Sequence, residues 1–145
     1  MYQFSRSIFR ELAPGVVPAR GEDVTATRMR FLRACECSME RLATDRHYFA
    51  RPARTLFNDI RVFFPMTAQG KAFRVVDTYM RLCDEWLAAQ PATGFDLLGN
   101  RLECRATTRK GKPCQRMPLP VNGYCPSHQH LAEAEEREAR LAAAA

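Results

Sequence analysis

A chain of 145 residues has about the length of one domain, which is long enough to bury a hydrophobic core. Hydrophobic residues make up 46% of it and charged residues 26%, and this globular composition excludes a disordered chain. The formal net charge of +6 favours an anionic partner, and the lack of a long apolar run or a signal-like first segment predicts a soluble cytoplasmic protein.

Two amphipathic segments are predicted in the first 45 residues. A short helix is expected over residues 3–12, because Pro14 and Gly15 end it. A long helix begins near Glu22, where acidic residues suit a helix N-terminus, and runs to about Asp45. Steps of three and four residues define its expected buried stripe: Met29, Leu32, Cys35, Met39 and Leu42.

Two further amphipathic helices follow. Pro52 opens the first of them and Pro65 stops it, and the second extends over residues 67–89 before Pro91. Both carry an apolar face at helical spacing: Leu56, Phe57, Ile60, Phe63 and Phe64 in the first, and Phe73, Val76, Met80, Cys83 and Leu87 in the second. No segment alternates with period two, so the fold class expected is all-α, a small bundle of three to four helices.

The C-terminal third has a different composition from the bundle. The run PATGFDLLGN joins the two parts, and its apolar residues indicate a docked junction rather than a free linker. The last segment, HLAEAEEREARLAAAA, has high helix propensity and predicts a terminal helix. The domains expected are therefore a helical bundle over residues 1–100, a small cysteine-containing module over 101–130 and a C-terminal helix over 131–145.

The chemical signal of the chain is a set of three cysteines and one histidine. Cys104, Cys114, Cys125 and His128 follow the spacing C-x9-C-x10-C-x2-H. Three thiolates and one imidazole complete a tetrahedral shell around Zn²⁺ and leave no position for water or substrate, so a structural zinc ion is the cofactor predicted. His130 lies two residues beyond His128 and is the alternative fourth ligand.

Turn chemistry in the same segment agrees with the ligand spacing. Gly111 and Gly123 stand shortly before the second and third cysteines, where knuckle-type turns often require a positive φ. The remaining cysteines, Cys35, Cys37 and Cys83, lie in predicted helices and are expected to pack as small apolar side chains.

The motif resembles the WRC-type zinc module of plant transcriptional regulators, which has the same order and spacing of ligands. It is also similar to short three-cysteine, one-histidine knuckles in bacterial and phage proteins. The resemblance covers residues 101–130 and implies that the four residues are zinc ligands and that the basic residues among them face nucleic acid.

Positive charge is concentrated around the predicted knuckle, which predicts electrostatic docking on phosphates, of DNA or RNA. The candidate contacts are Arg105, Arg109, Lys110, Lys112 and Arg116. The function expected is an accessory or regulatory nucleic-acid-binding protein, bound to nucleic acid or to a nucleic-acid-associated complex. A protein-interaction adaptor with a purely structural zinc site is the alternative. An enzyme, a membrane partner and a small-molecule substrate are not expected, because no P-loop, dinucleotide-type glycine pattern or nucleophile motif occurs.

Overall fold

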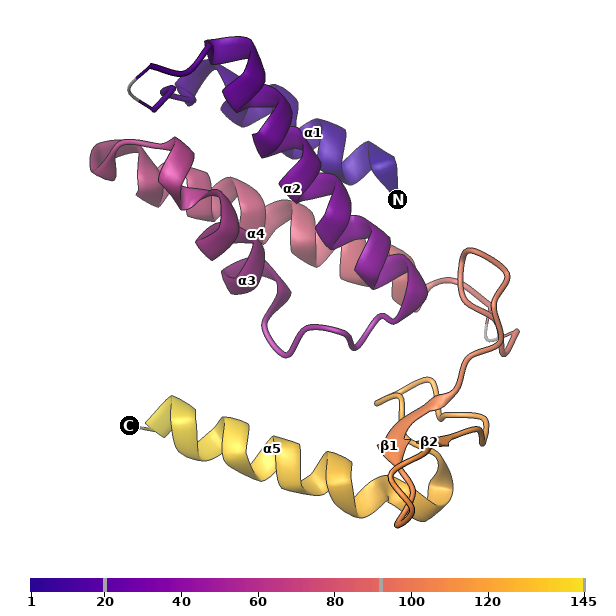
Figure 1. The fold of residues 1–145 in the computed structure, drawn as a ribbon. Helices are drawn as coiled ribbons and strands as arrows, with labels where there is room; N and C mark the ends of the chain where they lie inside the picture. Colours follow the sequence, from indigo (N-terminus) through magenta and orange to yellow (C-terminus); the bar gives the residue numbers. More distant parts are fainter. Residues whose placement is uncertain (20, 92, 145) are drawn as a thin grey trace. The chain divides into compact units, whose positions relative to one another are not determined.

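The computed structural model describes residues 1–19, 21–91 and 93–144, and within these ranges it contains five α-helices and one two-stranded sheet. The chain divides into two compact units, Met1–Gln90 and Pro91–Ala145 (Figure 1). It is mostly helical, and the small sheet in the second unit corrects the all-α prediction. None of the helices in the described ranges has the length and apolar character needed to cross a membrane.

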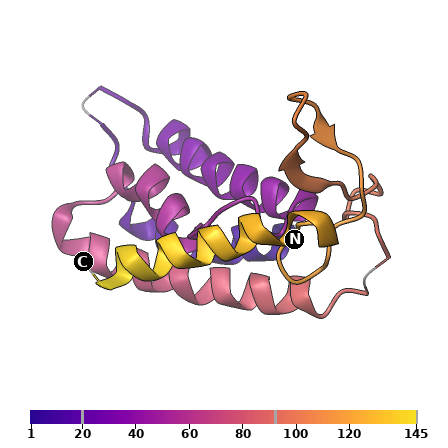
Figure 2. The same ribbon diagram turned by 90° about the horizontal axis from the view of Figure 1, so that it is seen from below.

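Four helices build the first unit (Figure 2). They are α1 (Tyr2–Leu12), α2 (Val24–Thr44), α3 (Pro52–Ile60) and α4 (Met66–Ala88). Helix α1 packs against α2 and α4, and α3 packs against the same two helices, as a small helical bundle would have it. Helix α1 thus docks its apolar face on its own chain.

Local chemistry sets the helix ends. The Oδ2 atom of Asp23 accepts a hydrogen bond of 3.0 Å from the backbone N–H of Ala26, which caps α2. Pro52 occupies the first turn of α3. A backbone N–H at this position has no acceptor within the helix, so proline, which lacks the N–H, costs no hydrogen bond there. The predicted continuation of α3 as far as Pro65 is wrong, because Arg61–Phe63 tighten into a 3₁₀ turn after Ile60.

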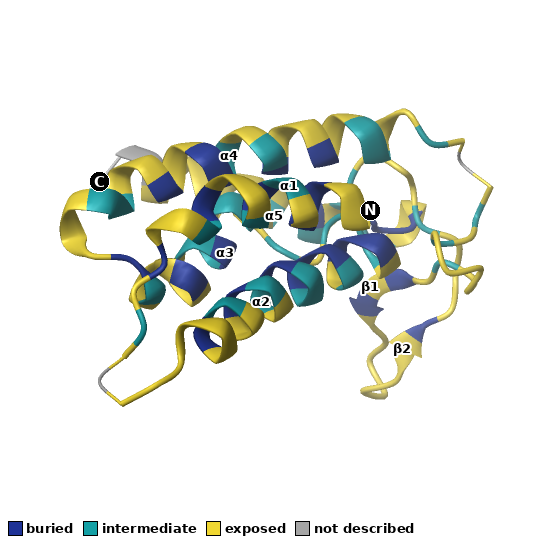
Figure 3. Ribbon diagram, turned by 90° about the horizontal axis from the view of Figure 1, so that it is seen from above, coloured by how far each residue is buried: buried dark blue, intermediate teal, exposed yellow. Residues whose placement is uncertain are grey.

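The buried face of α2 differs from the predicted stripe. Phe31 is fully buried, together with Cys35, Met39 and Leu42, whereas the side chain of Met29 is 57% exposed. In an α-helix, residues two positions apart in sequence are separated by about 200° around the helix axis. Met29 and Phe31 therefore face nearly opposite sides of α2. Figure 3 shows buried and exposed positions alternating along α2 and α4 at helical spacing.

Helix α4 buries most of the predicted face. Val76, Met80 and Cys83 are buried in the core with Ala72. Phe73 lies at the edge, 39% exposed, and its ring meets that of Phe57 at a centroid distance of 5.3 Å and nearly at right angles. This edge-to-face contact joins α3 to α4 at the border of the core.

Two of the three cysteines outside the knuckle behave as core residues. Cys35 and Cys83 are fully buried, and the Sγ atom of Cys83 lies 3.7 Å from the Sδ atom of Met39. Burial raises the pKa of Cys35 to about 12, so its thiol stays protonated. Cys37, two residues further along α2 than Cys35, is only partly buried.

A surface ion pair ties the loop after α2 to α4 and makes stability depend on pH. The Nε and Nη2 atoms of Arg46 donate to the two carboxylate oxygens of Asp84 at 2.8 and 3.1 Å. This bond, opposed by burial and aided by the charges of Arg46 and His47, lowers the pKa of Asp84. Because the folded-state pKa is depressed, the stabilisation is present above the unfolded value near pH 4 and is lost as pH falls through the folded value.

Replacing Asp84 by Asn is therefore expected to lower the free energy of unfolding by less than about 1 kcal/mol at pH 7, as is usual for a surface pair. The difference from wild type should vanish in acid, below the folded pKa of Asp84. Urea unfolding followed by circular dichroism from pH 7 to pH 2 measures this, with Asp77→Asn as the matched variant on the same helix. A difference that is unchanged down to pH 2 would contradict the linkage.

The second unit consists of short elements around one small core. They are β1 (Cys104–Thr107), β2 (Pro113–Cys114), a 3₁₀ turn (Pro126–His128) and α5 (Gln129–Ala144). Strands β1 and β2 pair antiparallel, and α5 confirms the predicted terminal helix.

The segment before β1 is a folded loop. The carboxylate of Asp96 accepts hydrogen bonds from the backbone N–H groups of Leu98 and Asn100 at 2.8 and 2.7 Å, and the N–H of Leu102 donates to the carbonyl of Gly94 at 2.9 Å. The predicted junction is therefore ordered by its own hydrogen bonds.

Candidate metal centre

The second unit brings the four predicted ligands together from three places in the chain. Cys104 opens β1, Cys114 closes β2, Cys125 directly precedes the 3₁₀ turn and His128 is its last residue. Their Sγ atoms and a ring nitrogen of His128 all lie within 4.8 Å of one another, and the three cysteines are buried. This Cys₃His group could hold a metal ion, and residues separated by 24 positions in sequence form it.

The separations suit a tetrahedral metal site. With metal–sulfur bonds of about 2.3 Å and metal–nitrogen bonds of about 2.05 Å, tetrahedral geometry places sulfur about 3.6 Å from the ligand nitrogen. The Nδ1 atom of His128 lies 3.4 Å from the Sγ atom of Cys104 and 3.3 Å from that of Cys125. The four donors are thus gathered as a metal would need them, and a three-thiolate, one-imidazole set is typical of structural zinc.

His128, and not His130, is the histidine of this group. His130 is the second residue of α5, is exposed, and lies with its ring centroid 6.1 Å from that of His128. The backbone N–H of His128 donates to the carbonyl of Cys125 at 2.9 Å, which closes the turn between the two ligands. The short C-x2-H pair is therefore the compact chelating turn.

Both predicted glycine turns have the required conformation. Gly111 has φ +73° and Gly123 has φ +74°, in the region that side chains with a Cβ rarely adopt. Gly111 forms the end of the β1–β2 hairpin, and Gly123 precedes Tyr124 and the third cysteine. These two turns let the chain reverse on either side of the metal site.

Side-chain hydrogen bonds hold the turn between Cys125 and His128 and the residues just before it. The side-chain amide of Gln129 donates to the carbonyls of Tyr124 and Cys125 at 3.0 and 3.2 Å. The side-chain Nδ2 of Asn122 donates to the Oε1 of Gln129 at 2.7 Å, and the side-chain Oδ1 of Asn122 accepts from the backbone N–H of Tyr124 at 3.1 Å. Such partners behind the ligands orient them and limit rearrangement.

The side chain of Arg105 contacts Tyr124 and Glu135 within the second unit. Its guanidinium lies 5.2 Å from the ring centroid of Tyr124 and 3.4 Å from the carboxylate of Glu135. The hydroxyl of Tyr124 donates to Glu135 at 2.6 Å, and burial together with this bond raises the pKa of the phenol. Arg105 thereby links β1 to α5.

The thiols have unequal tendencies to ionise. Burial opposes ionisation of Cys104, but hydrogen bonds from the backbone N–H groups of Cys125 and Ala106 and from His128 outweigh it and lower the pKa of Cys104 to about 7. Burial, with the neighbouring sulfur of Cys104, raises the pKa of Cys125. Metal ligands bind as thiolates, so Cys104 is already inclined to the form that a metal requires.

The five predicted basic residues fall into two groups. Arg109, Lys110 and Lys112 are exposed at the tip of the hairpin, and in the described ranges none of them forms an ion pair. Arg105 has the contacts given above, and a terminal nitrogen of Arg116 donates to the hydroxyl of Ser127 at 2.6 Å. The tip therefore presents three unpaired cations, whereas Arg105 and Arg116 have partners within the unit.

Hydrogen bonds within the hairpin close the loop that carries the basic tip. Thr108 and Lys112 exchange backbone and side-chain bonds of 2.7, 3.0 and 3.3 Å, and the N–H of Gly111 donates to the carbonyl of Thr108 at 2.9 Å. Strand pairing joins Cys104 to Cys114 at the base of the hairpin, so both ends of the basic loop are residues of the candidate metal site.

Sequence reasoning missed the polar residues that support the site. Tyr124, Asn122, Gln129 and Glu135 carry no metal chemistry of their own, so the ligand spacing does not single them out. The Asn-Gly pair before Tyr124 was the available signal, because it is a turn dipeptide.

Comparison of the chain with protein-family models, with curated proteins and with solved structures finds no match in any of the three. The resemblance to the WRC-type module therefore rests on the ligand residues and their spacing, and it stays a prediction. What the fold supports by itself is a gathered Cys₃His group that could hold a metal ion.

Proposed function

We propose that this chain is an accessory or regulatory nucleic-acid-binding protein, in which Cys104, Cys114, Cys125 and His128 hold a structural zinc ion. The site would have no open position, because four protein donors fill a tetrahedral shell. It would therefore stabilise the second unit and position its surface, and would not act on a substrate.

The observation that carries the proposal is the basic hairpin tip. Arg109, Lys110 and Lys112 occupy four consecutive positions with Gly111, and the ends of the hairpin are zinc ligands in this proposal. Three cations at fixed spacing suit the phosphates of a nucleic-acid backbone, whose counterions they would displace. Contacts to phosphate position a protein without reading sequence, so the binding expected is salt-dependent and largely non-specific.

The test is binding of the zinc-loaded protein to duplex DNA, single-stranded DNA and structured RNA by fluorescence anisotropy across a salt series. Binding should weaken as salt rises, because each phosphate contact releases about one counterion. Replacing Arg109 and Lys112 together by alanine should reduce the slope of log K against log salt by about two units on duplex DNA.

A matched control removes the same charge elsewhere in the unit. Arg137 and Arg140 lie exposed on α5, and their double alanine variant changes the net charge by the same amount. This control should retain the wild-type slope. Equal losses in the two double variants, or no binding to any of the three nucleic acids at low salt, would sink the proposal.

The second candidate function is a protein-interaction adaptor. The exposed apolar side chains of the second unit favour it. Phe95, Leu98, Met117 and Val121 are all more than half exposed. Exposed apolar residues mark interaction surfaces when they are contiguous. Binding of a partner protein that survives alanine replacement of Arg109 and Lys112, and is lost when Phe95 and Leu98 become serine, would favour the adaptor.

A further inference from the structure

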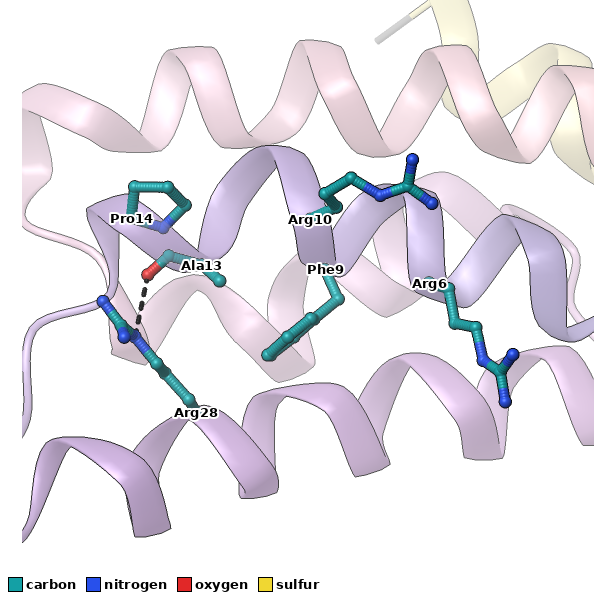
Figure 4. Close-up of a pocket in the computed structure, with 6 residues that line it drawn as sticks. All are labelled: Arg6, Phe9, Arg10, Ala13, Pro14 and Arg28. Atoms are coloured by element: carbon teal, nitrogen blue, oxygen red, sulfur yellow. Dashed lines mark hydrogen bonds between the residues drawn. The ribbon is translucent and has the colours of Figure 1, made fainter.

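The arginines around the surface depression beside α1 do not face a common ligand. Figure 4 shows the guanidinium groups of Arg6, Arg10 and Arg28 pointing away from one another. The Nε–H of Arg28 donates to the carbonyl of Ala13 at 3.2 Å, which holds it at one end of the depression. By contrast, the three thiols of the candidate metal site lie together in the second unit.

These thiols are close enough to react with one another. The Sγ atoms of Cys104, Cys114 and Cys125 lie within 4.8 Å of one another, and all three are free thiols. A disulfide also requires a suitable backbone, with the two Cα atoms about 4.4–6.8 Å apart. The backbone therefore decides which pair can be joined.

Strand pairing selects Cys104 and Cys114. They are register partners on β1 and β2. Residues opposite each other on antiparallel strands have Cα atoms about 4.5–5.5 Å apart, which lies inside the range of a disulfide. Cys125 belongs to neither strand and is fully buried, whereas Cys104 and Cys114 each keep 4% of their surface exposed. A small oxidant therefore reaches the two strand partners first.

We propose that a hydroperoxide, such as hydrogen peroxide, joins Cys104 and Cys114 in a cross-strand disulfide. The thiolate of one cysteine attacks a peroxide oxygen, the O–O bond breaks, and the other oxygen leaves as hydroxide, so the first product is a sulfenic acid. The second thiolate attacks that sulfur, the S–O bond breaks, and the oxygen leaves as hydroxide. In sum, two thiols lose two electrons and two protons, and the peroxide is reduced to water.

The disulfide replaces a closure through the metal by a covalent one. It removes two of the four donors, and the pair that is left, Cys125 and His128, does not complete a tetrahedral shell. The base of the hairpin stays joined, while the turn from Cys125 to His128 loses its anchor. This consequence rests on the zinc ion of the proposed function, whereas the disulfide itself does not.

The test is treatment of the zinc-loaded full chain with hydrogen peroxide, followed by peptide mapping of disulfides by mass spectrometry and by measurement of released zinc. The expected result is a disulfide between Cys104 and Cys114, loss of the bound zinc, and recovery of both after reduction and zinc addition. Cys125→Ser should still form the disulfide, because both strand partners remain. Cys37→Ser should behave like wild type in each measurement.

The matched control is the same chain in urea with a chelator. Nine residues separate Cys104 from Cys114 and ten separate Cys114 from Cys125, so loop entropy favours the two pairings almost equally. The denatured chain should therefore give both disulfides in comparable amounts, and the folded chain mainly the cross-strand one. A folded chain that gives the denatured mixture, or mainly a disulfide to Cys125, would overturn the inference.

The two proposals fail separately. A chain that binds zinc but forms no disulfide with peroxide contradicts the redox inference alone. A chain that binds no zinc but forms the disulfide between Cys104 and Cys114 contradicts the proposed zinc site alone.

Discussion

Removal of the metal, or the substitution Cys114→Ser, is expected to unfold residues 101–130 while the helices of the first unit persist. The second unit has little else to hold it: in the part that the structure describes, its buried hydrophobic cluster is Cys104, Ala106, Cys114, Tyr124, Cys125 and Ala132. Half of that core is metal-site thiol. Zinc binding to small modules contributes about 10–16 kcal/mol of apparent free energy, which exceeds what so small a core supplies.

Hydrogen exchange measured segment by segment separates the two units. The expected result is rapid exchange across the hairpin and the chelating turn after chelation, with unchanged protection in α2 and α4, because the two units are separately compact. Metal analysis of the purified protein should return one zinc per chain, and Cys114→Ser should reduce it.

Cys37→Ser is the matched control. Cys37 is partly buried and lies outside the Cys₃His group, so zinc content and the protection of the second unit should equal those of wild type. Protease resistance of residues 101–130 that is unchanged after complete metal removal would show that the metal does not support this fold.

The substitution Phe31→Ala is expected to lower the free energy of unfolding of the first unit by about 3–5 kcal/mol. Phe31 is fully buried, and its ring meets those of Phe9, Phe63 and Phe64 at centroid distances of 5.6, 6.1 and 5.5 Å. Truncation removes apolar contact with α1 and with the turn after α3 together, and leaves a cavity. Because whole-domain stability is about 5–15 kcal/mol, the loss is a large share of it.

Met29→Ala on the same helix is the control for this prediction. Met29 is 57% exposed, so its truncation should change the free energy of unfolding by less than about 0.5 kcal/mol. Urea unfolding of both variants, followed by circular dichroism at 222 nm (the usual helix wavelength), measures the difference. A loss below about 1 kcal/mol for Phe31→Ala would contradict the assigned core.

The sequence by itself determined the helices and the four residues that form the candidate metal site. Helical periodicity and proline positions are local signals, so α1 to α5 were predictable to within a few residues apart from the end of α3. The candidate metal site is also visible in the sequence, because the spacing of three cysteines, one histidine and two turn glycines within a short segment indicates it. The structure brings those four residues within 4.8 Å of one another, with both glycines at positive φ.

Only the tertiary structure decided which faces are buried and which charges are free. Both Met29 and Phe31 are apolar, and the packing of α1 and α3 against α2 selects the face of Phe31. Arg105 and Arg109 look alike in sequence, yet the fold places Tyr124 and Glu135 beside the first and leaves the second at the hairpin tip. Burial and charge pairing depend on residues distant in sequence, which local patterns do not encode.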